Sequence, residues 1–226
     1  MKNLIFQGIL FDADGTLYDS SLLHFEAYRA VSKKLYGFDF TKELFDEECM
    51  KKNKQPVAIL QEHGINCTTE EFYKLKKPYY EDIARKKLRA TPGLMGFLQT
   101  IRGSLIPVGV VSSATKHSIS TSLDIVHLTA YFPIIVAYED IPDAQKPSPE
   151  SYLLGAKLLG KPANSCLVFE DTAVGIQAAK SAGMKCIAVR NVTNSDSELQ
   201  EADLIIQSYS ELHFTFTHPG IELTFP

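Results

Sequence analysis

The sequence predicts an α/β protein built on a doubly wound parallel sheet with one helical insertion. Two observations predict the sheet: short apolar runs recur along the chain, and helical patterns follow most of them. A third observation predicts the insertion, because residues 20–87 contain no convincing strand pattern. The chain has 226 residues, 45% of them hydrophobic and 22% charged, which is enough for a large core and a smaller second domain.

Six runs have the character of buried strands. They are short, rich in Val and Ile, and apolar on both faces, as are strands of a sheet that helices cover on both sides. Because helical patterns lie between several of them, we expect right-handed crossovers and one parallel sheet. The six runs are residues 8–11, 107–111, 134–137, 166–169, 186–189 and 203–206.

Two helices between these runs have recognisable ends. Ser148 as a cap with Pro149 at the first helical position predicts one start, and Gly160 predicts its end. A second helix is predicted to begin near Thr172 and to end at Gly183. Its many Gly and Ala residues allow close packing on a sheet.

The insertion has three amphipathic or highly charged helical patterns. They cover residues 22–37, 41–54 and 68–88, and Pro78 is expected to interrupt the last one. We therefore predict a core of residues 1–18 and 89–226 and a helical domain of residues 19–88. The insertion follows an aspartate-rich loop, a path that allows it to lie above the carboxyl ends of the strands, where open α/β sheets bind ligands.

Composition excludes several classes of function. A net charge of −4 argues against nucleic-acid binding, and no apolar run is long enough to span a membrane. The four cysteines form no C-x-x-C pair and no zinc spacing, so we expect a reducing, cytoplasmic setting. No heptad or repeat indicates the oligomeric state, and our expectation is a monomer or a weak homodimer.

Polar side chains follow four of the predicted strands, at the edge where parallel strands all end. Four carboxylates at this edge would face one lysine, so a cation should complete the site. Oxygen ligands suit Mg²⁺, and lysine and hydroxyl donors suit a phosphoryl group. In chain order the residues are Asp12, Asp14, Ser112, Ser113, Lys146, Glu170 and Asp171.

These residue types indicate phosphoryl transfer, which depends on alignment and charge neutralisation. Asp12, at the strand end, is the candidate nucleophile and would form an aspartyl-phosphate. Asp14 would protonate the leaving oxygen and then activate water. Lys146 would balance charge on the nucleophile and the phosphate, and Ser112 would donate a hydrogen bond to the phosphate.

Glu170 and Asp171 would hold the metal, with Asp171 as the direct ligand. Each segment also has an ordinary structural interpretation. Glu170 and Asp171 suit any helix N-terminus, and residues 12–16 could be an Asp/Gly turn. Ser112 and Ser113 could form an N-cap pair, and Lys146 could be a solvated surface residue. Only the convergence of all four segments favours a catalytic site.

The segments DADGT, VVSS, KPSPE and FEDTAVGIQAAKSAG, in this order and spacing, resemble the four motifs of the haloacid dehalogenase superfamily. The resemblance implies a Rossmann-like core, Mg²⁺ and an aspartyl-phosphate intermediate. It implies that Asp12 and Asp14 also bind the metal, Asp14 through its backbone carbonyl. The helical insertion is similar to the α-helical cap of that family, which closes over the substrate.

Within the superfamily, the chain most resembles the branch of β-phosphoglucomutase and of small sugar-phosphate or phosphoglycolate phosphatases. The stretch DSSLLHFEAY is similar to the cap entry of that branch, and His24 would be its histidine, which in mutases assists the proton-transfer aspartate. Mutases carry a Lys-Gly-x-x-Arg signature in the cap. Residues 51–55 have neither the Gly nor the Arg, which favours a phosphatase. True dehalogenases lack the second aspartate, so Asp14 argues against dehalogenation.

We therefore expect an enzyme, a Mg²⁺-dependent phosphatase that hydrolyses a small phosphomonoester metabolite of the sugar-phosphate or phosphoglycolate type. Its substrate site would include Ser112, Ser113 and His24. A hexose-phosphate mutase is the first alternative. A non-catalytic phosphoacceptor or binding protein is the second, because response-regulator receivers combine similar residues on such a sheet.

Overall fold

The computed structural model describes residues 4–52, 54–104, 106–216 and 220–224 of the chain. The chain divides into two compact units. The core unit comprises Met1–Asp19 and Arg89–Pro226, and the helical unit comprises Ser20–Leu88.

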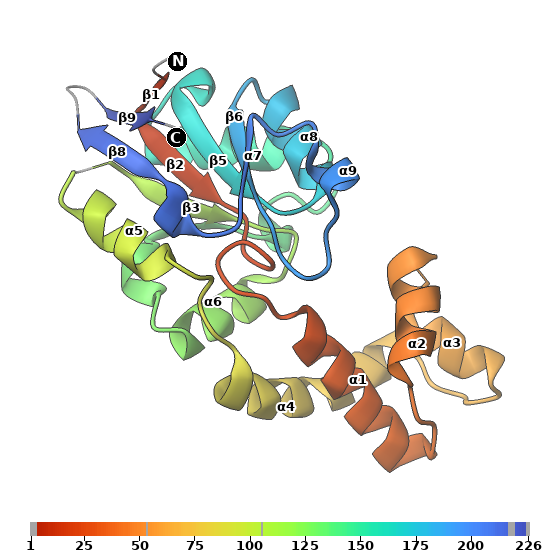
Figure 1. Ribbon diagram of the computed structural model, residues 1–226. Helices are drawn as coiled ribbons and strands as arrows, with labels where there is room; N and C mark the ends of the chain where they lie inside the picture. Colours follow the sequence, from red (N-terminus) through yellow and green to blue (C-terminus); the bar gives the residue numbers. More distant parts are fainter. Residues whose placement is uncertain (1–3, 53, 105, 217–219, 225–226) are drawn as a thin grey trace. The chain divides into compact units, whose positions relative to one another are not determined.

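The core unit contains a six-stranded sheet in which every pairing is parallel (Figure 1). Its strand order is β4-β3-β2-β5-β6-β7, so the chain crosses over between non-consecutive neighbours as a doubly wound fold does. This confirms the predicted fold class, and each predicted strand agrees with the structure to within one residue at either end. The strands are β2 (Gly8–Phe11), β3 (Val108–Val111), β4 (Ile134–Val136), β5 (Cys166–Glu170), β6 (Lys185–Val189) and β7 (Leu204–Ile206).

Helices cover both faces of this sheet (Figure 1). Leu10 and Phe11 of β2 are both fully buried, although successive strand residues point to opposite faces. Phe11 packs in an aromatic cluster with Phe97 and Phe169, and Leu10 lies in an aliphatic cluster with Val168. The core helices are α5 (Leu94–Arg102), α6 (Lys116–Ile125), α7 (Glu150–Leu159), α8 (Ala173–Ser181) and α9 (Asp196–Leu199). Short 3₁₀ turns are η2 (Thr129–Tyr131), η3 (Tyr138–Asp140), η4 (Ala163–Ser165) and η5 (Tyr209–Glu211).

The helix ends follow the predicted pattern with one exception. Gly160 follows α7 in a left-handed conformation with φ of 67°, and the Thr172 hydroxyl caps α8 by accepting a hydrogen bond from the Gly175 amide. The predicted Ser148 cap is wrong, because Pro149 occupies the cap position of α7. The Ser148 hydroxyl donates to the carboxylate of Glu150 and does not bond a backbone amide.

A second sheet joins the two ends of the chain, which the sequence patterns did not predict. It is antiparallel, with the order β1-β9-β8. Its strands are β1 (Leu4–Phe6), β8 (His213–Phe216) and β9 (Ile221–Thr224). The Phe214 ring centroid lies 4.8 Å from that of Phe97, so part of the apolar C-terminal tail packs against the core unit.

The helical unit has no strand among its described residues. Gly37 ends α1 with φ of 67°, as predicted. The predicted interruption at Pro78 is wrong, because α4 continues through it. Burial of Phe72 and Tyr80 on either side of Pro78 favours a continuous helix despite the lost backbone hydrogen bond. The elements are α1 (Ser21–Tyr36), α2 (Lys42–Leu44), the π-helix η1 (Phe45–Lys51), α3 (Pro56–Glu62) and α4 (Thr69–Lys87).

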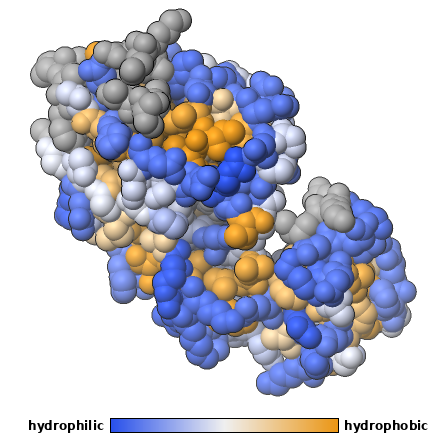
Figure 2. Space-filling model, viewed as in Figure 1, coloured by the Kyte–Doolittle hydropathy of each residue, from blue (hydrophilic) through white to orange (hydrophobic). Residues whose placement is uncertain are grey.

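Charged side chains of the helical unit pair on its surface. Arg29 Nε lies 2.6 Å from Asp39 Oδ1, and Lys54 Nζ lies 2.6 Å from Glu62 Oε2. Hydrophilic residues cover most of the face seen in Figure 2, with apolar residues in smaller patches. Exposed ion pairs of this kind contribute little to stability, so the helical unit is stabilised mainly by the burial of its apolar side chains.

Two findings bear on the expected setting of the chain. All four cysteines have free thiols, and Cys166 and Cys186 are buried in β5 and β6. Within the described part of the chain, no helix has the length and apolar character needed to cross a membrane.

Candidate active site

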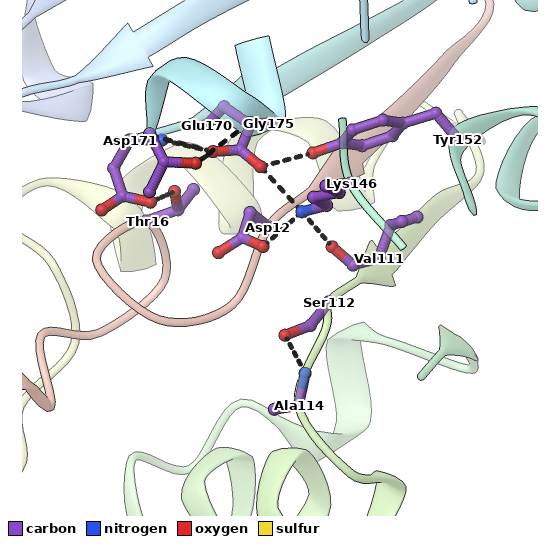
Figure 3. A network of polar contacts seen from close by, with 11 residues as sticks. Asp12, Thr16, Val111, Ser112, Ala114, Lys146, Tyr152, Glu170, Asp171 and Gly175 are labelled. Atoms are coloured by element: carbon purple, nitrogen blue, oxygen red, sulfur yellow. Dashed lines mark hydrogen bonds and ion pairs between the residues drawn. The ribbon is translucent and has the colours of Figure 1, made fainter. Parts of the chain in front are cut away.

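A buried lysine joins three strands at the carboxyl edge of the six-stranded sheet (Figure 3). Lys146 Nζ donates to Asp12 Oδ1 at 2.5 Å, to Glu170 Oε1 at 2.7 Å and to the backbone oxygen of Val111 at 3.0 Å. The lysine side chain is only 6% exposed. Charged groups from three separate segments therefore meet at one point, in the region where the sequence places the site.

The position of Asp12 follows from the strand pairing. β2 is a central strand, in register with β3 and β5 on its two sides. The Asp12 amide donates to the Phe169 oxygen at 2.9 Å, which extends the β2–β5 ladder by one residue. Because the backbone of Asp12 is fixed in this way, its carboxylate leaves the sheet at a defined point, in contact with Lys146.

Both carboxylate oxygens of Glu170 accept hydrogen bonds from the protein. Oε1 accepts from Lys146 Nζ and from the Tyr152 hydroxyl at 2.9 Å. Oε2 accepts from the backbone amides of Asp171 at 2.9 Å and Thr172 at 3.0 Å, and from the Thr172 hydroxyl at 3.0 Å. Glu170 is thus fully engaged as a buried acceptor that faces Lys146.

Asp171 is 6% exposed and lies beside the aspartate-rich loop. Its Oδ2 accepts from Asn191 Nδ2 at 2.8 Å, and its Oδ1 lies 3.4 Å from the Thr16 hydroxyl. Asn191 is not among the residues predicted from the sequence. It follows β6 after one intervening residue, so the search for polar residues at strand ends that identified the other groups could also have found it.

Two glycines make this packing possible. A Cβ atom at Gly15, where φ is +84°, would lie 2.0 Å from Asp171 Oδ2. A Cβ atom at Gly175 would lie 1.7 Å from Glu170 Oε1. Both carboxylates therefore need a neighbouring position without a side chain.

The remaining predicted core residues have distinct environments. Asp14 is half-buried in the turn after Asp12, where it forms an isolated bridge with Tyr18. Ser112 is buried at the end of β3, and its Oγ accepts from the Ala114 amide at 3.1 Å. Ser113 is exposed.

The structural alternative of a serine N-cap pair is wrong. The helix after β3 is α6, and its cap is Thr115, whose hydroxyl accepts from the Ser118 amide at 3.3 Å. The chain needs two more residues after Ser113 to turn from the strand into the helix. Ser112 and Ser113 are therefore not used to start α6.

His24 belongs to the helical unit, on α1. Its Nδ1 lies 2.8 Å from the ammonium of Lys76, and its ring stacks on Tyr80 with centroids 4.4 Å apart. Burial, followed by the charge of Lys76, lowers the pKa of His24 to about 3. The imidazole is therefore neutral near pH 7, and because an ammonium only donates, Nδ1 is the acceptor and Nε2 carries the proton.

The carboxyl groups of the core site are incompletely balanced. Burial raises the pKa of Asp12 to about 7 even though Lys146 lowers it. Burial, with the charges of Asp12 and Glu170, raises the pKa of Asp171 well above its usual range. Burial works to raise the pKa of Glu170, but the charge and hydrogen bond of Lys146, together with the backbone amides of Thr172 and Asp171, lower it below its usual value. A positive charge beside Asp12 and Asp171 would favour their ionised forms.

The donor set is compatible with a small, hard cation. No three acidic, histidine or cysteine side chains form a metal cluster in the part of the chain that the structure describes. Such a cluster is unnecessary for Mg²⁺, which usually takes one or two carboxylates together with waters and phosphate oxygens. Asp12 and Asp171 supply two under-compensated carboxylates, whereas Glu170 already has protein donors on both oxygens.

Comparisons with known proteins identify the family. The pattern of the haloacid dehalogenase-like hydrolases matches residues 9–189. The chain is 30% identical over 201 residues to the phosphorylated carbohydrates phosphatase of Thermotoga maritima, with 88% of this chain and 92% of that protein covered. It is also 30% identical over 216 residues to hexitol phosphatase A of Escherichia coli, with 92% and 94% covered.

Solved structures agree. A HAD hydrolase of family IA, variant 3, from Entamoeba histolytica is similar with a TM-score of 0.76 at 26% identity, covering 92% of this chain and 95% of that one. Its likeness extends over nearly the whole length of both proteins. The family pattern alone spans more than half of this sequence. This chain belongs to the haloacid dehalogenase-like hydrolase family.

Proposed function

We propose that the protein is a Mg²⁺-dependent phosphatase that hydrolyses a small phosphomonoester through an aspartyl-phosphate. The observation that carries this proposal is the contact of Lys146 with both Asp12 and Glu170 beside a second buried aspartate, Asp171. Family membership supports hydrolysis. The two relatives named above are phosphatases, one of phosphorylated carbohydrates and one named for hexitols, which supports a phosphorylated sugar or a related small metabolite.

Asp12 is the proposed nucleophile. Lys146 holds Oδ1, which leaves Oδ2 to attack phosphorus. A bond forms between Oδ2 and phosphorus as the ester oxygen leaves, and Asp14 gives that oxygen its proton. Asp14 then accepts a proton from water, the water oxygen bonds to phosphorus, and the Asp12–phosphorus bond breaks to release inorganic phosphate.

Asp12, Asp171 and the backbone carbonyl of Asp14 would hold the magnesium ion. The ion would supply positive charge that offsets the carboxylates and the transferring phosphoryl group. Glu170, with both oxygens already bonded, would act mainly by fixing Lys146.

Lys146 and Ser112 would bind the phosphoryl group. Lys146 contributes a buried positive charge whose pKa is raised, because Asp12 and Glu170 outweigh the lowering by burial. The Ser112 oxygen accepts from the Ala114 amide, so its hydroxyl proton remains able to point toward a phosphate oxygen. Exposed Ser113 would contribute less.

The helical unit would act as the cap that selects the substrate, with His24 as one of its polar groups. A reducing, cytoplasmic setting is supported by the four free thiols. A monomer or weak homodimer stays a prediction, which size-exclusion chromatography with light scattering tests.

Replacing Asp12 by Asn tests the proposed nucleophile. Phosphate release from p-nitrophenyl phosphate with Mg²⁺ should fall by at least about a thousandfold, because an amide is a far weaker nucleophile than a carboxylate. The matched control is Asp124→Asn, an exposed aspartate on α6, which should keep full activity. Full activity of Asp12→Asn with an unchanged circular dichroism spectrum would end the proposal.

A panel of phosphorylated metabolites, with and without Mg²⁺, identifies the substrate and separates the alternatives. A mutase would convert β-glucose 1-phosphate to glucose 6-phosphate, whereas a phosphatase releases inorganic phosphate. A phosphoacceptor protein would be phosphorylated once without repeated turnover. Multiple turnovers with phosphate as product support the proposal, and either other outcome contradicts it.

A further inference from the structure

The loop after β6 reaches back to the acidic site through two asparagines. Asn191 Nδ2 lies 2.8 Å from Asp171 Oδ2 and 3.4 Å from the Gly15 oxygen. Asn194 Nδ2 lies 3.0 Å from the backbone oxygen of Asp171 and 3.0 Å from that of Val189. The loop therefore contacts Asp171 at both its side chain and its backbone, and it also touches the aspartate-rich loop.

Neighbouring groups fix the orientation of both amides. Asn191 Oδ1 accepts from the Thr193 amide at 2.9 Å, the Thr193 hydroxyl at 2.8 Å and the Asn194 amide at 3.1 Å. Asn194 Oδ1 accepts from the Asn191 amide at 3.1 Å. Because backbone amides can only donate, the oxygen of each side chain must face them, and each NH₂ group must face Asp171.

This arrangement leaves Asp171 little freedom. Its Oδ2 is held by Asn191 and packs over Gly15, where even a Cβ atom would overlap it. Its other oxygen has only the longer 3.4 Å contact with the Thr16 hydroxyl among the hydrogen bonds described. The short bond from Asn191 is therefore the main restraint on the carboxylate plane.

We propose that Asn191 is a positioning residue for the metal ligand Asp171, holding its carboxylate in the orientation that binds the cation. This inference rests on the proposed function. It adds a residue outside the four sequence motifs that carry the family resemblance.

A neutral donor suits this position better than a charged one. A lysine or arginine beside Asp171 would orient the carboxylate, but it would also cancel the negative charge that attracts the cation. An amide donates a hydrogen bond and leaves that charge in place. Hydrogen-bond partners of metal ligands commonly change metal affinity by about 10- to 100-fold when removed.

The test is direct metal binding to the full chain without substrate. Mn²⁺ is the probe, because bound Mn²⁺ loses the sharp paramagnetic resonance signal of the free ion, and Mg²⁺ competition gives the Mg²⁺ affinity. Asn191→Ala and the similarly sized Asn191→Leu should both raise the dissociation constant about tenfold or more. The melting temperature of the metal-free protein reports whether each variant is folded.

Thr193→Ala is the matched control. Thr193 is exposed, and its hydroxyl bonds the same asparagine on the oxygen that faces away from Asp171. This change loosens the loop but leaves the bond to Asp171, so metal affinity should stay within about twofold of the parent protein's. A loss as large as that of Asn191→Ala would show a general loop effect and overturn the proposal.

Asp171→Asn distinguishes a failure of the metal site from a failure of the proposed role of Asn191. If it abolishes Mn²⁺ binding and Asn191→Ala leaves the dissociation constant unchanged, the role of Asn191 is refuted and the metal site stands. If Asp171→Asn has no effect, or the parent protein binds no Mn²⁺, the metal site itself fails and the inference fails with it. As a kinetic check, saturating Mg²⁺ should restore phosphate release in Asn191→Ala and not in Asp171→Asn.

Discussion

Lys146 of the core unit and Lys76 of the helical unit both have buried side chains, but their neighbours differ. Lys146 Nζ bonds two carboxylates, those of Asp12 and Glu170. Lys76 is 4% exposed and lies against the ring of Tyr28, 3.9 Å from its centroid. Two carboxylates therefore contact the Lys146 ammonium, whereas aromatic rings lie against the Lys76 ammonium.

The aromatic neighbourhood of Lys76 comes from α1 and α4. Besides Tyr28, the rings of Tyr73 and Tyr80 lie 5.3 and 5.7 Å from its Nζ. The Nδ1 atom of His24 accepts its hydrogen bond at 2.8 Å. Ring faces and a nitrogen lone pair both stabilise a cation.

Burial of a lysine therefore does not by itself define its role. In the core unit, three buried carboxyl groups surround the single ammonium of Lys146, so the cluster lacks positive charge. Such a cluster is suited to bind a cation together with a phosphoryl group. In the helical unit, three tyrosine rings and the imidazole of His24 lie against Lys76, so its removal loses cation–π contacts and a hydrogen bond.

Lys146→Met should have the largest effect. It leaves Asp12 and Glu170 buried without their counter-charge, and breaking such a pair costs about 3–5 kcal/mol. Amide hydrogen exchange in β2 and β5 measures this loss, and phosphate release should disappear with it. Lys157→Met, an exposed lysine on α7, is the control and should change neither quantity. A loss below about 1 kcal/mol would contradict the ionic view of this lysine.

Gly175→Ala disturbs the same cluster without changing a charge. Its Cβ would lie 1.7 Å from Glu170 Oε1, so the carboxylate must move away from Lys146. We expect a loss of about 1–3 kcal/mol in the free energy of unfolding and a lower rate of phosphate release. In contrast, Gly96→Ala on α5 meets nothing within 4 Å and should stabilise the protein by about 0.5–1 kcal/mol. Equal effects of the two substitutions would rule out the steric argument.

The pH dependence of the helical unit should reflect His24. Its pKa is lowered from 6.5 to about 3 in the folded unit, first by burial and then by the charge of Lys76. Between these two pH values the imidazole is protonated in the unfolded chain and neutral in the folded unit. The contribution of neutral His24 to the free energy of unfolding is fully present above pH 6.5, and it is lost as the pH falls from 6.5 toward 3. At pH 5 the loss should reach about 2 kcal/mol, at about 1.4 kcal/mol per pH unit.

Hydrogen exchange in α1 and α4 at pH 7 and pH 5 measures that loss. His24→Gln removes the titrating group and serves as the comparison, because other groups titrate equally in both proteins. The drop in the free energy of unfolding between pH 7 and pH 5 should be about 2 kcal/mol smaller in the variant. An imidazole that takes up a proton near pH 6.5 in nuclear magnetic resonance spectra would contradict the buried, neutral assignment.

Lys76→Met should have the smallest effect. Replacement by an apolar side chain of similar length removes cation–π contacts and the hydrogen bond to His24, so the helical unit should lose about 1 kcal/mol of stability. The pKa of His24 should rise, because one cause of its lowering is gone, yet burial should keep it below 6.5. If this substitution costs as much as Lys146→Met, the contrast between the two lysines is wrong.

The strands of the main sheet were predictable because the buried runs are local and apolar on both faces. Gly37, Gly160 and Gly183 marked helix ends for a local reason too, since each adopts a left-handed conformation with φ between 67° and 76°. In the small antiparallel sheet, the pairing of β1 with β9 was not predicted because it is remote: Leu4 pairs with Leu223, and no local pattern identifies that partner.

The candidate site divides in the same way. Asp12, Lys146 and Asp171 could be proposed from strand-end positions, because parallel strands bring their carboxyl ends to one edge. The sequence also favoured Asp171 over Glu170 as the direct metal ligand. The engagement of both Glu170 oxygens with Lys146 and other protein donors could not be predicted, since it depends on packing.

Local sequence patterns predict the parallel α/β core, the helical insertion and the strand ends at which the acidic residues lie. These depend on hydrophobic periodicity and on glycine and proline at turns, which are properties of neighbouring residues. Tertiary structure alone decided that α4 continues through Pro78, that the chain ends share a sheet, and that Asn191 lies against Asp171. Those outcomes depend on contacts between residues distant in the chain, whose energies outweigh local preferences only after the chain has folded.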